Sequence, residues 1–558
     1  MTEAHELFAA HQETLDRAVT ATRTREYYSA YNESPSPRVY GDNAAADGQA
    51  AFEAWLGTTF PLDTPGASGT VATEKSPFGI ELEVSYPRVA PSGVDDLMRA
   101  AAAGIKAFRD AGPAARAGVC LEILHRLHGR TFELANAVQH TSGQAFVMAF
   151  QAGGAHALDR ALEAVAYSYD EMTRVPETVI WEKPGKGEPL RMEKTFTAVP
   201  RGLALVIGCN TFPTWNSWPG LFASLACGNP VVVKPHPGAV LPLALTVQVA
   251  QEVLVETGFD PNLVALAAED PADGLAAVLA VRPEVKLVDF TGSNKFGEWL
   301  EENARQATVF TEKAGVNTVV IDSTDSFRGL CTNLAFSFSL YTGQMCTAPQ
   351  NVYLPADGIE TDEGHKSVSE VAQGIGAAFD KLLGDDKRAV ELLGGVVNDG
   401  VLSRLESSGG RGTVYVSSRA VHHPAYDGAV VRTPTLIGLS AEDADVYENE
   451  CFGPVAYLIE TSGTEQSVGL FRTTVHEHGA MTASVYSTSP DVIAQMRDAA
   501  LDVGVALSEN LTDGVFVNQS AAFSDFHGTG ANPAANASYT DTAYVASRFR
   551  FVQSRRHI

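Results

Sequence analysis

Hydrophobic residues between positions 94 and 174 recur three and four residues apart, which is the spacing of one face of an α-helix. The first stripe consists of Leu97, Ala101, Ile105 and Phe108, and a second continues through Leu124, Leu127 and Leu134. A helix with such a stripe turns one face toward a core and the other toward solvent. We therefore predict a run of core-packed helices in this part of the chain.

A different rhythm begins at Gly202, where short apolar runs alternate with longer helical patterns. The apolar runs predict strands at 203–208, 230–233, 263–267 and 285–290, and the patterns between them predict helices at 215–226, 239–256 and 275–281. Strands and helices that alternate in this way form a parallel, doubly wound sheet covered by helices. Such a sheet binds ligands at the carboxyl ends of its strands.

The segments on either side of this unit are less regular. Residues 1–75 mix short helical stretches with Pro- and Gly-bearing segments, and they predict an extension wrapped on a larger body. Residues 179–200 predict two strands around a charged turn, and a mixed α/β region continues to about residue 500. The tail from 543 to 554 alternates like a strand. The predicted fold class is therefore α/β, with more than one structural unit.

The chain of 558 residues carries 40 Lys and Arg against 67 Asp and Glu, which gives a formal net charge of −27. Nucleic-acid-binding proteins carry a basic surface and anionic membranes attract basic segments, so this balance argues against both partners. The first residues lack the basic and apolar regions of a signal peptide, and the apolar runs are far shorter than a membrane span. We expect a soluble protein that binds neither nucleic acid nor membrane.

The six cysteines are sparse for a chain of this length. No two form a C-x-x-C, and no pair of histidines stands beside them at zinc-ligand spacing. We therefore expect no disulfide framework and no metal site. Reduced thiols are typical of the cytoplasm, which is the localisation we predict, and one of them could be a nucleophile.

The common phosphate-binding signatures are absent, because no G-x-G-x-x-G follows a predicted strand and the sequence holds no G-x-x-x-x-G-K-[ST]. Phe290-Thr291-Gly292-Ser293 stands instead at the carboxyl end of a predicted strand, with a helix behind it. Free backbone amides at that helix start, together with the Ser293 hydroxyl, would suit a pyrophosphate. An ordinary Ser cap on a strand-to-helix turn explains the same residues equally well.

A thiol and a carboxylate are the strongest candidates for catalytic chemistry. Cys346 follows Gly343-Gln344-Met345, and a Gly-Gln pair lets the backbone turn sharply and aim the thiol into a cleft. Glu312 lies 34 residues earlier and could act as general base, which makes covalent catalysis by Cys346 a hypothesis. A buried structural cysteine is the plainer alternative. Glu450, just before Phe452-Gly453-Pro454, has no evident core role, although a solvated loop carboxylate would also explain it.

Taken in order, these segments resemble the aldehyde dehydrogenase superfamily from about Pro91 to the C-terminus. The matching runs are Pro200-Arg201-Gly202, Phe212-Pro213-Thr214-Trp215, Val233-Lys234-Pro235, Phe290-Thr291-Gly292-Ser293, Glu312 with Gly315, Gly343-Gln344-x-Cys346 and Glu450-x-Phe452-Gly453-Pro454. The resemblance implies an aldehyde dehydrogenase-like α/β fold. Its parts would be an N-terminal extension (1–90), a Rossmann-type NAD(P)-binding domain (91–311), a catalytic domain (312–505) and a C-terminal segment with an oligomerisation strand (506–558). The hairpin at 179–200 would belong to a small β oligomerisation arm.

The resemblance also implies a role for each matched residue. Cys346 would be the nucleophile and Glu312 the general base. The cofactor-binding residues would be Lys234 at the adenosine ribose, Gly292 and Ser293 at the pyrophosphate, Glu450 at the nicotinamide ribose and Phe452 beside the nicotinamide. The family's oxyanion Asn stands directly before Phe-Pro, where this chain has Thr211, so Asn210 could serve only if the loop is shifted by one residue.

The family's Glu-Leu-Gly-Gly-Lys is replaced here by Glu312-Lys313-Ala314-Gly315-Val316. With the run from Phe526 to Pro533, this form resembles a narrower branch, the PaaN-type proteins of aerobic phenylacetate degradation. Their relatives oxidise an aldehyde produced by ring opening of a coenzyme A-linked intermediate. The resemblance implies NAD(P)+-dependent oxidation of such a semialdehyde to a free acid, since coenzyme A-acylating relatives usually lack the carboxylate at Glu312. A semialdehyde dehydrogenase of benzoate degradation, a broad-range aldehyde dehydrogenase and a catalytically silent structural subunit stay open as alternatives.

Cofactor and partners follow from the same resemblance. Members that prefer NAD+ often carry a Glu where this chain has Pro237. Without that carboxylate, no negative charge opposes the attraction of Lys234 and His236 for a 2′-phosphate. We therefore predict NADP+ as the cofactor, with NAD+ as the alternative. The resemblance implies a homodimer or homotetramer. Too few residues follow the last dehydrogenase-like run for a fused ring-opening domain, so we expect a separate hydratase.

Overall fold

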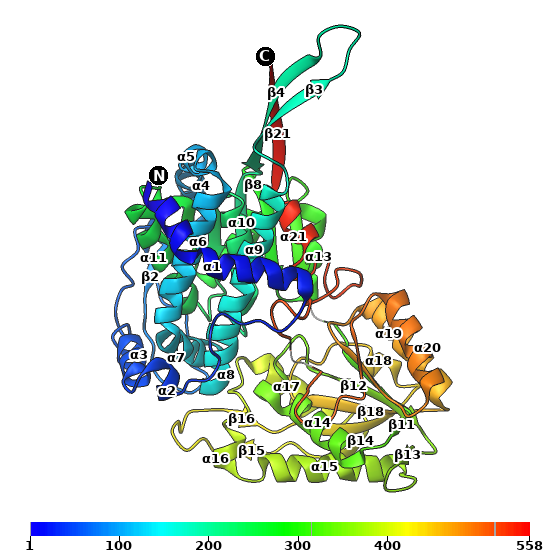
Figure 1. Ribbon diagram of the computed structural model, residues 1–558. Coiled ribbons are helices and arrows are strands. Elements are labelled where there is room, and N and C mark those ends of the chain that lie inside the picture. Colours follow the sequence, from blue (N-terminus) through cyan, green and yellow to red (C-terminus); the bar gives the residue numbers. More distant parts are fainter. Residues whose placement is uncertain (1, 314, 518–519) are drawn as a thin grey trace.

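The computed structural model describes residues 2–313, 315–517 and 520–558. Two α/β bodies lie one above the other, and a narrow three-stranded arm projects from the upper one (Figure 1). The upper body is built on a five-stranded sheet and the lower body on a seven-stranded sheet. The predicted α/β fold class is confirmed.

The N-terminal extension is more regular than its broken pattern suggests. The helix α1 (Thr2–Thr24) runs for 23 residues and packs against α6 (Gly112–Gly129) and α9 (His156–Thr173) (Figure 1). Isolated helices are marginal in water, so the fully buried Leu15 and Ala18 stabilise α1 through packing. The rest of the extension consists of α2 (Pro37–Tyr40), α3 (Ala44–Glu53), β1 (Ala67–Val71) and β2 (Tyr86–Val89).

The two predicted stripes are the buried faces of helices in the upper body. Leu97, Ala101 and Phe108 are fully buried, and so are the three leucines of the second stripe. The helices are η1 (Pro91–Gly93), α4 (Val94–Ala103), α5 (Ile105–Asp110), α6, α7 (Thr131–Ser142), α8 (Phe146–Phe150), the π-helical turn η2 (Gln151–Ala155) and α9. The predicted run of core-packed helices is confirmed.

The upper sheet has the strand order β7-β6-β5-β8-β9, and all its pairs are parallel. Its strands are β5 (Leu203–Ile207), β6 (Val231–Lys234), β7 (Val264–Leu266), β8 (Val285–Thr291) and β9 (Thr308–Glu312). Between them lie α10 (Pro213–Ala226), α11 (Leu241–Glu256), η3 (Pro261–Leu263), η4 (Pro271–Asp273), α12 (Leu275–Ala280) and α13 (Asn294–Asn303). The predicted elements are confirmed, with ends that differ by one or two residues. The chain order reverses at β5, which is where doubly wound sheets bind ligands.

The lower sheet has the order β14-β17-β18-β12-β10-β19-β20, in which β14 pairs antiparallel with β17 and the other pairs are parallel. Its strands are β10 (Thr318–Ile321), β12 (Asn351–Pro355), β14 (Thr413–Val416), β17 (Thr435–Ser440), β18 (Val455–Thr461), β19 (Ala483–Tyr486) and β20 (Leu507–Glu509). Its helices are α14 (Phe327–Ser339), η5 (Leu340–Gly343), α15 (Val368–Leu383), α16 (Asp386–Ala389), α17 (Asp399–Ser408), α18 (Ala444–Tyr447), α19 (Thr464–His478) and α20 (Pro490–Val503). Two small ladders join β11 (Ser323–Thr324) to β13 (Glu360–Thr361) and β15 (Ala420–Val421) to β16 (Val431–Arg432). Strand β20 lies beyond residue 505, where we predicted the catalytic domain to end.

The arm is an antiparallel sheet of β21 (Phe549–His557), β4 (Leu190–Pro200) and β3 (Thr178–Lys183). It stands clear of both bodies at the top of Figure 1. The strand predicted for the tail begins later than expected, because Tyr544 and Ala546 belong to a short helix, α21 (Thr542–Ala546), whose residues Tyr544 and Val545 are buried. Within the described part of the chain, none of the helices combines the length and apolarity needed to cross a bilayer.

Candidate active site

Glu312 is the last residue of β9, at the carboxyl end of the upper sheet. Its carboxylate is buried, since only 1% of the residue is exposed. Nδ2 of Asn216, in the first turn of α10, donates to Oε2 at 2.9 Å. Nε2 of His527, from the segment between β20 and α21, lies 3.0 Å from the other oxygen, Oε1. One side chain therefore contacts each carboxylate oxygen, which fixes the plane of the group.

Cys346 belongs to the lower body and follows a tight left-handed turn. Residues 341–343 have φ values of 53°, 56° and 65°, a region that residues other than glycine rarely adopt. A Cβ at Gly343 would stand 2.4 Å from the carbonyl oxygen of Gly453, so glycine is required there. Oε1 of Gln344 accepts a hydrogen bond from the backbone amide of Val397 at 3.0 Å, and this bond holds the turn. The sharp turn predicted from Gly343 and Gln344 is confirmed.

The two residues predicted as nucleophile and general base meet between the two bodies. A carboxylate oxygen of Glu312, Sγ of Cys346 and a ring nitrogen of His527 lie within 4.8 Å of one another. Sγ of Cys346 is 3.9 Å from Nε2 of His527. The structure thus brings the predicted pair together and adds a histidine to it.

Sequence reasoning missed His527 and Asn216 as residues of the site. Asn216 is a buried amide in an otherwise largely apolar helix, and buried polar side chains need partners. That break in the apolar pattern is the signal that could have identified it. His527 lies in an irregular segment, so the sequence gives no indication that its ring contacts Glu312.

The site holds an ionised carboxylate beside a protonated thiol. Burial by itself would raise the pKa of Glu312, but the contacts with His527, Cys346 and Asn216 outweigh it and hold the pKa below the usual 4.5. Burial, together with the charge of Glu312, raises the pKa of Cys346 well above 9.0. A thiol in this state is a poor nucleophile until a neighbouring base takes its proton.

Asn210 contacts α7 and the turn at Gly238. Its Nδ2 donates to the carbonyl oxygen of Thr141 in α7 at 2.9 Å, and its Oδ1 packs against Gly238, where a Cβ would come within 2.6 Å. One N–H of this amide is therefore held by α7. The hydroxyl of Thr211 faces Sγ of Cys209 at 4.0 Å. Asn216, and not Asn210, supplies the side-chain amide that contacts Glu312, and the oxyanion role of Asn210 stays a prediction.

Lys234 ends β6 with its ammonium buried and paired with the carboxylate of Glu269, which follows β7. Glu269 also accepts a hydrogen bond from the amide of Leu275 at 2.6 Å, so the carboxylate is fixed. Nδ1 of His236 accepts from the amide of Gly238 at 3.0 Å, and burial, with the charge of Lys234, lowers the pKa of His236 to about 4. The expectation that Lys234 and His236 stand unopposed is therefore wrong.

Gly292 and Ser293 connect β8 to α13 beside the base. The Ser293 hydroxyl caps α13 by accepting from the amide of Phe296 at 3.4 Å. The amide of Gly292 donates to the backbone carbonyl of Glu312 at 3.1 Å, so this turn is tied to the strand end that carries the carboxylate. The N-terminus of α13 carries a partial positive charge suited to a phosphate. The geometry agrees with both the cap and the pyrophosphate interpretation.

Glu450 and Phe452 come from the loop between α18 and β18. They line a small pocket next to the thiol turn, together with Gly315, Gly343 and Met345. Burial raises the pKa of Glu450 to about 7, although the charge of Arg404 acts in the opposite direction. Nε of Arg404 donates to the Phe452 carbonyl at 2.9 Å and orders this loop. Both residues predicted for the nicotinamide side therefore lie beside the Cys346 turn.

The strand ends of a doubly wound sheet meet a buried carboxylate and a neighbouring thiol here, an arrangement that defines a class of α/β enzyme with a dinucleotide-type fold. The model of the aldehyde dehydrogenase family matches residues 65–514. The chain belongs to this family, and the superfamily inferred from the sequence motifs is confirmed.

Comparison with solved structures and curated proteins supports the same assignment. The chain is 57% identical to an NAD-dependent aldehyde dehydrogenase from Burkholderia multivorans, with 99% of both chains covered and a TM-score of 0.97. It is 23% identical to a 1-pyrroline-5-carboxylate dehydrogenase of Bacillus mycoides over 475 residues, and this aligned region covers 82% of this chain and 86% of that protein. It is 27% identical over 274 residues to a 2-aminomuconic 6-semialdehyde dehydrogenase of a Pseudomonas species, 46% of this chain and 52% of the relative. The chain spans between 50% and 66% of the length of the first curated relatives that it matches.

Proposed function

We propose that the chain oxidises an aldehyde to a carboxylic acid through a thioester on Cys346, with a nicotinamide dinucleotide as hydride acceptor. The observation that carries this proposal is the contact between the buried carboxylate of Glu312 and the thiol of Cys346. The 57% identity to an NAD-dependent aldehyde dehydrogenase over 99% of both chains supports the same activity.

The residues of the site account for the steps in order. Glu312 takes the proton of the thiol as Sγ of Cys346 bonds to the aldehyde carbon. The nicotinamide, when bound, supplies the hydride acceptor for the resulting thiohemiacetal. After the thiol proton has passed from Glu312 to solvent, the carboxylate takes a proton from water as the oxygen attacks the thioester, the carbon–sulfur bond breaks and that proton returns to sulfur. The product is a free acid because this carboxylate activates water.

Five groups fit a nicotinamide dinucleotide along the strand ends. Lys234 would contact the adenosine ribose, and Gly292 with Ser293 would hold the pyrophosphate at the start of α13. Glu450 and Phe452 would hold the nicotinamide end, since they line the pocket beside the thiol turn. The predicted preference for NADP+ loses its premise, because Glu269 already neutralises Lys234 and His236 is uncharged at neutral pH. Since neither of these two residues offers a free positive charge to a 2′-phosphate, we propose NAD+ as the preferred cofactor.

The proposed substrate is a ring-opened, coenzyme A-linked semialdehyde of phenylacetate degradation, as in PaaN-type proteins. The support is the run Glu312-Lys313, with the run from Phe526 to Pro533, and the presence of a water-activating carboxylate. Ala314 of the first run lies outside the described residues. The similarity to a protein named as a semialdehyde dehydrogenase is consistent with an aldehyde that carries a second functional group.

We further propose a homodimer or homotetramer held by the arm, and a separate hydratase that opens the ring. Val179, Ile180, Leu190 and Val552 are exposed apolar residues on the arm, and an exposed apolar sheet is a surface that a second copy can cover. Cytoplasmic localisation is part of the proposal, because the cysteines of the described chain are free thiols.

The direct test is a substrate screen with both cofactors. Purified protein is mixed with semialdehyde thioesters, with the matching free semialdehydes and with simple aldehydes, and the absorbance of NADH or NADPH is followed. We expect the highest kcat/KM for a coenzyme A-linked semialdehyde with NAD+. Equal kcat/KM for the thioesters and the free semialdehydes would contradict the coenzyme A part of the proposal, and a higher kcat/KM with NADP+ would contradict the cofactor part.

A further inference from the structure

His527 contacts both reacting groups of the site through a single atom. Its Nε2 lies 3.0 Å from Oε1 of Glu312 and 3.9 Å from Sγ of Cys346. The residue is 5% exposed, so its ring is shielded from solvent. Because Nε2 lies close to both the carboxylate and the sulfur, His527 can influence the transfer of the thiol proton between them.

The contact with Glu312 shows which atom carries the ring proton. An ionised carboxylate only accepts hydrogen bonds, so Nε2 of His527 must be protonated to lie 3.0 Å from it. A protonated Nε2 cannot also take the proton of Cys346. The base for the thiol is therefore Glu312, and His527 acts on Glu312 as a hydrogen-bond donor.

The ring is held in this place from two sides. It packs edge-to-face on Trp215 of α10, with ring centroids 4.5 Å apart. Its backbone amide donates to the carbonyl of Tyr539 at 3.1 Å, and its carbonyl accepts from the amide of Tyr539 at 2.9 Å. The chain between these two residues thus forms a closed loop, and the backbone pair His527–Tyr539 is its neck.

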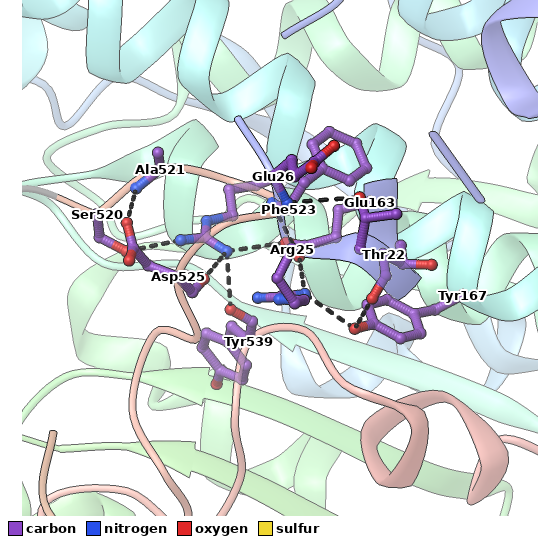
Figure 2. A network of polar contacts seen from close by, with 12 residues as sticks. Thr22, Arg25, Glu26, Glu163, Tyr167, Ser520, Ala521, Phe523, Asp525 and Tyr539 are labelled. Carbon is purple, nitrogen blue, oxygen red and sulfur yellow. Dashed lines mark hydrogen bonds and ion pairs between the residues drawn. The ribbon is translucent and has the colours of Figure 1, made fainter. Parts of the chain in front are cut away.

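Arg160, a fully buried residue of α9, anchors the neck of this loop. Its Nη1 donates to the carbonyl oxygens of Asp525 at 2.9 Å and Tyr539 at 3.2 Å, and its guanidinium lies 5.4 Å from the centre of the Trp215 ring. Figure 2 shows Asp525 and Tyr539 converging on this network from the same loop. The buried guanidinium of Arg160 therefore holds the loop at Asp525 and at Tyr539, and it also contacts the Trp215 ring on which His527 packs.

The N-terminal extension completes the support. Arg25 lies 3.9 Å from the ring centre of Phe526, the residue before His527, and its Nη1 contacts Glu163 and Tyr167 of α9 (Figure 2). Glu163 in turn accepts from the amide of Phe523 at 3.0 Å. Three segments far apart in the sequence thus hold the loop that carries His527.

We propose that His527 is a positioning residue for the base. Its Nε2–H holds the Glu312 carboxylate against Cys346, and it then donates to the thiolate that forms when the thioester is hydrolysed. This inference rests on the proposed roles of Cys346 and Glu312. The hydrolysis step balances: water loses a proton to Glu312, its oxygen bonds to the acyl carbon, the carbon–sulfur bond breaks, and the proton on Glu312 returns to sulfur.

The charged and titratable groups around this pair determine how it responds to pH. They are Cys346 and Glu450 from the lower body, Cys209 from the loop after β5, Tyr539 from the C-terminal loop, and Arg160 behind Trp215. Burial keeps the pKa values of the two thiols and of Tyr539 high, so these groups stay neutral while Glu312 titrates. Loss of the donor at His527 should therefore be seen as a higher pKa of Glu312.

The experiment uses p-nitrophenyl acetate as the probe, because it acylates a thiol without aldehyde or cofactor. The p-nitrophenol burst reports acylation of Cys346, and the steady phase reports hydrolysis of the acetyl thioester. His527→Phe keeps a ring on Trp215 but removes the donor, whereas His527→Gln keeps an N–H near the position of Nε2. For His527→Phe we expect a retained burst and a steady phase slowed about 10- to 100-fold, the range for loss of one hydrogen bond to a charged group. Its acid limb should move up by about one to two pH units.

His527→Gln should retain most of the steady rate and the acid limb of the wild type. Circular dichroism and thermal unfolding check that His527→Phe is folded, and His527→Ala takes the same test if it is not. Steady phases equal to wild type in both the Phe and Gln variants would overturn the inference. So would equal slowing in both without a shift of the acid limb, since that result indicates packing alone. A wild-type protein that is not acylated on Cys346, checked by peptide mass spectrometry, would instead contradict the proposed nucleophile itself.

Discussion

Replacing Glu312 with Gln removes the proposed base and keeps the size of the side chain. The carboxylate accepts from Asn216 Nδ2 at 2.9 Å and from His527 Nε2 at 3.0 Å. A Gln amide has one oxygen and one NH2 group, so one of these donors would then face another donor. Loss of a hydrogen bond to a charged group costs about 1.5–3 kcal/mol of stability, which a family member of this size tolerates.

The effect on turnover should be larger and should fall on both steps that use the base, attack by the thiol and hydrolysis of the thioester. A positioned general base contributes roughly 10²- to 10⁴-fold, so hydrolysis of the thioester should slow by that factor. Rapid mixing of Glu312→Gln with an aldehyde substrate and NAD+ should give a slowed burst of at most one NADH per site and then a near stall. Intact-mass measurement at the plateau should find the acyl group on Cys346.

The matched control is Glu298→Gln on α13, an exposed glutamate that should leave both phases unchanged. Steady turnover at the full rate in Glu312→Gln would refute the assignment of the base. A burst at the wild-type rate would show that the carboxylate is not the acceptor of the thiol proton, and the absence of any burst or acyl adduct would show that attack by the thiol depends wholly on Glu312.

Three further predictions follow from individual contacts. Cys346→Ala should abolish NADH formation, whereas Cys331→Ala, a buried thiol of α14, should retain it; turnover in Cys346→Ala would exclude the covalent route. Glu269→Gln should free the charge of Lys234 and raise kcat/KM for NADP+ relative to NAD+ by about tenfold or more, and an unchanged ratio would show that the pair does not control cofactor choice. Glu450 has a pKa of about 7 in the folded protein against 4.5 in the unfolded chain, so the folded state binds the extra proton and loses stability as the pH rises from about 4.5 to 7. Glu450→Gln should remove this loss, by at most about 3 kcal/mol at pH 8, and melting curves at pH 5 and pH 8 that differ equally in both proteins would contradict it.

The doubly wound unit could be predicted from the sequence because its signals are local. Apolar runs such as 203–207 and 285–290 have a buried strand's length, and the patterns between them have a helix's period. The predicted strand ends then place Lys234 and Gly292 on one edge without any knowledge of distant contacts, whereas the strand that ends at Glu312 is not among the predicted ones. Glu312 ends a strand of the upper sheet and Cys346 lies in a loop of the lower body, so the residue types alone give their pairing only as a hypothesis, to which the family resemblance adds support.

What could not be predicted depends on contacts between distant segments. The partner of Lys234 is Glu269 from the next strand end, and no motif links the two residues. Asn210 and Asn216 both flank Phe212-Pro213, and only the packing of α7 and α10 decides which amide reaches Glu312. The tail alternates like a strand, yet Tyr544 is buried in a helix because its hydroxyl donates to Asp289 at 2.6 Å. Tertiary contacts override the local pattern at each of these positions.

The C-terminal loop is fixed at its far end by a buried ion pair whose role is specificity. Arg548 is fully buried, and its guanidinium donates to both oxygens of Asp289 on β8, at 2.8 Å and 2.6 Å. Such a pair adds little net stability, because both charges lose their hydration, but any other docking of the tail would leave a buried charge unpaired. Arg160 imposes the same condition on the near end of the loop. Arg160 and Arg548 thus fix the two ends of the segment that carries His527, and this segment brings the ring into contact with Glu312.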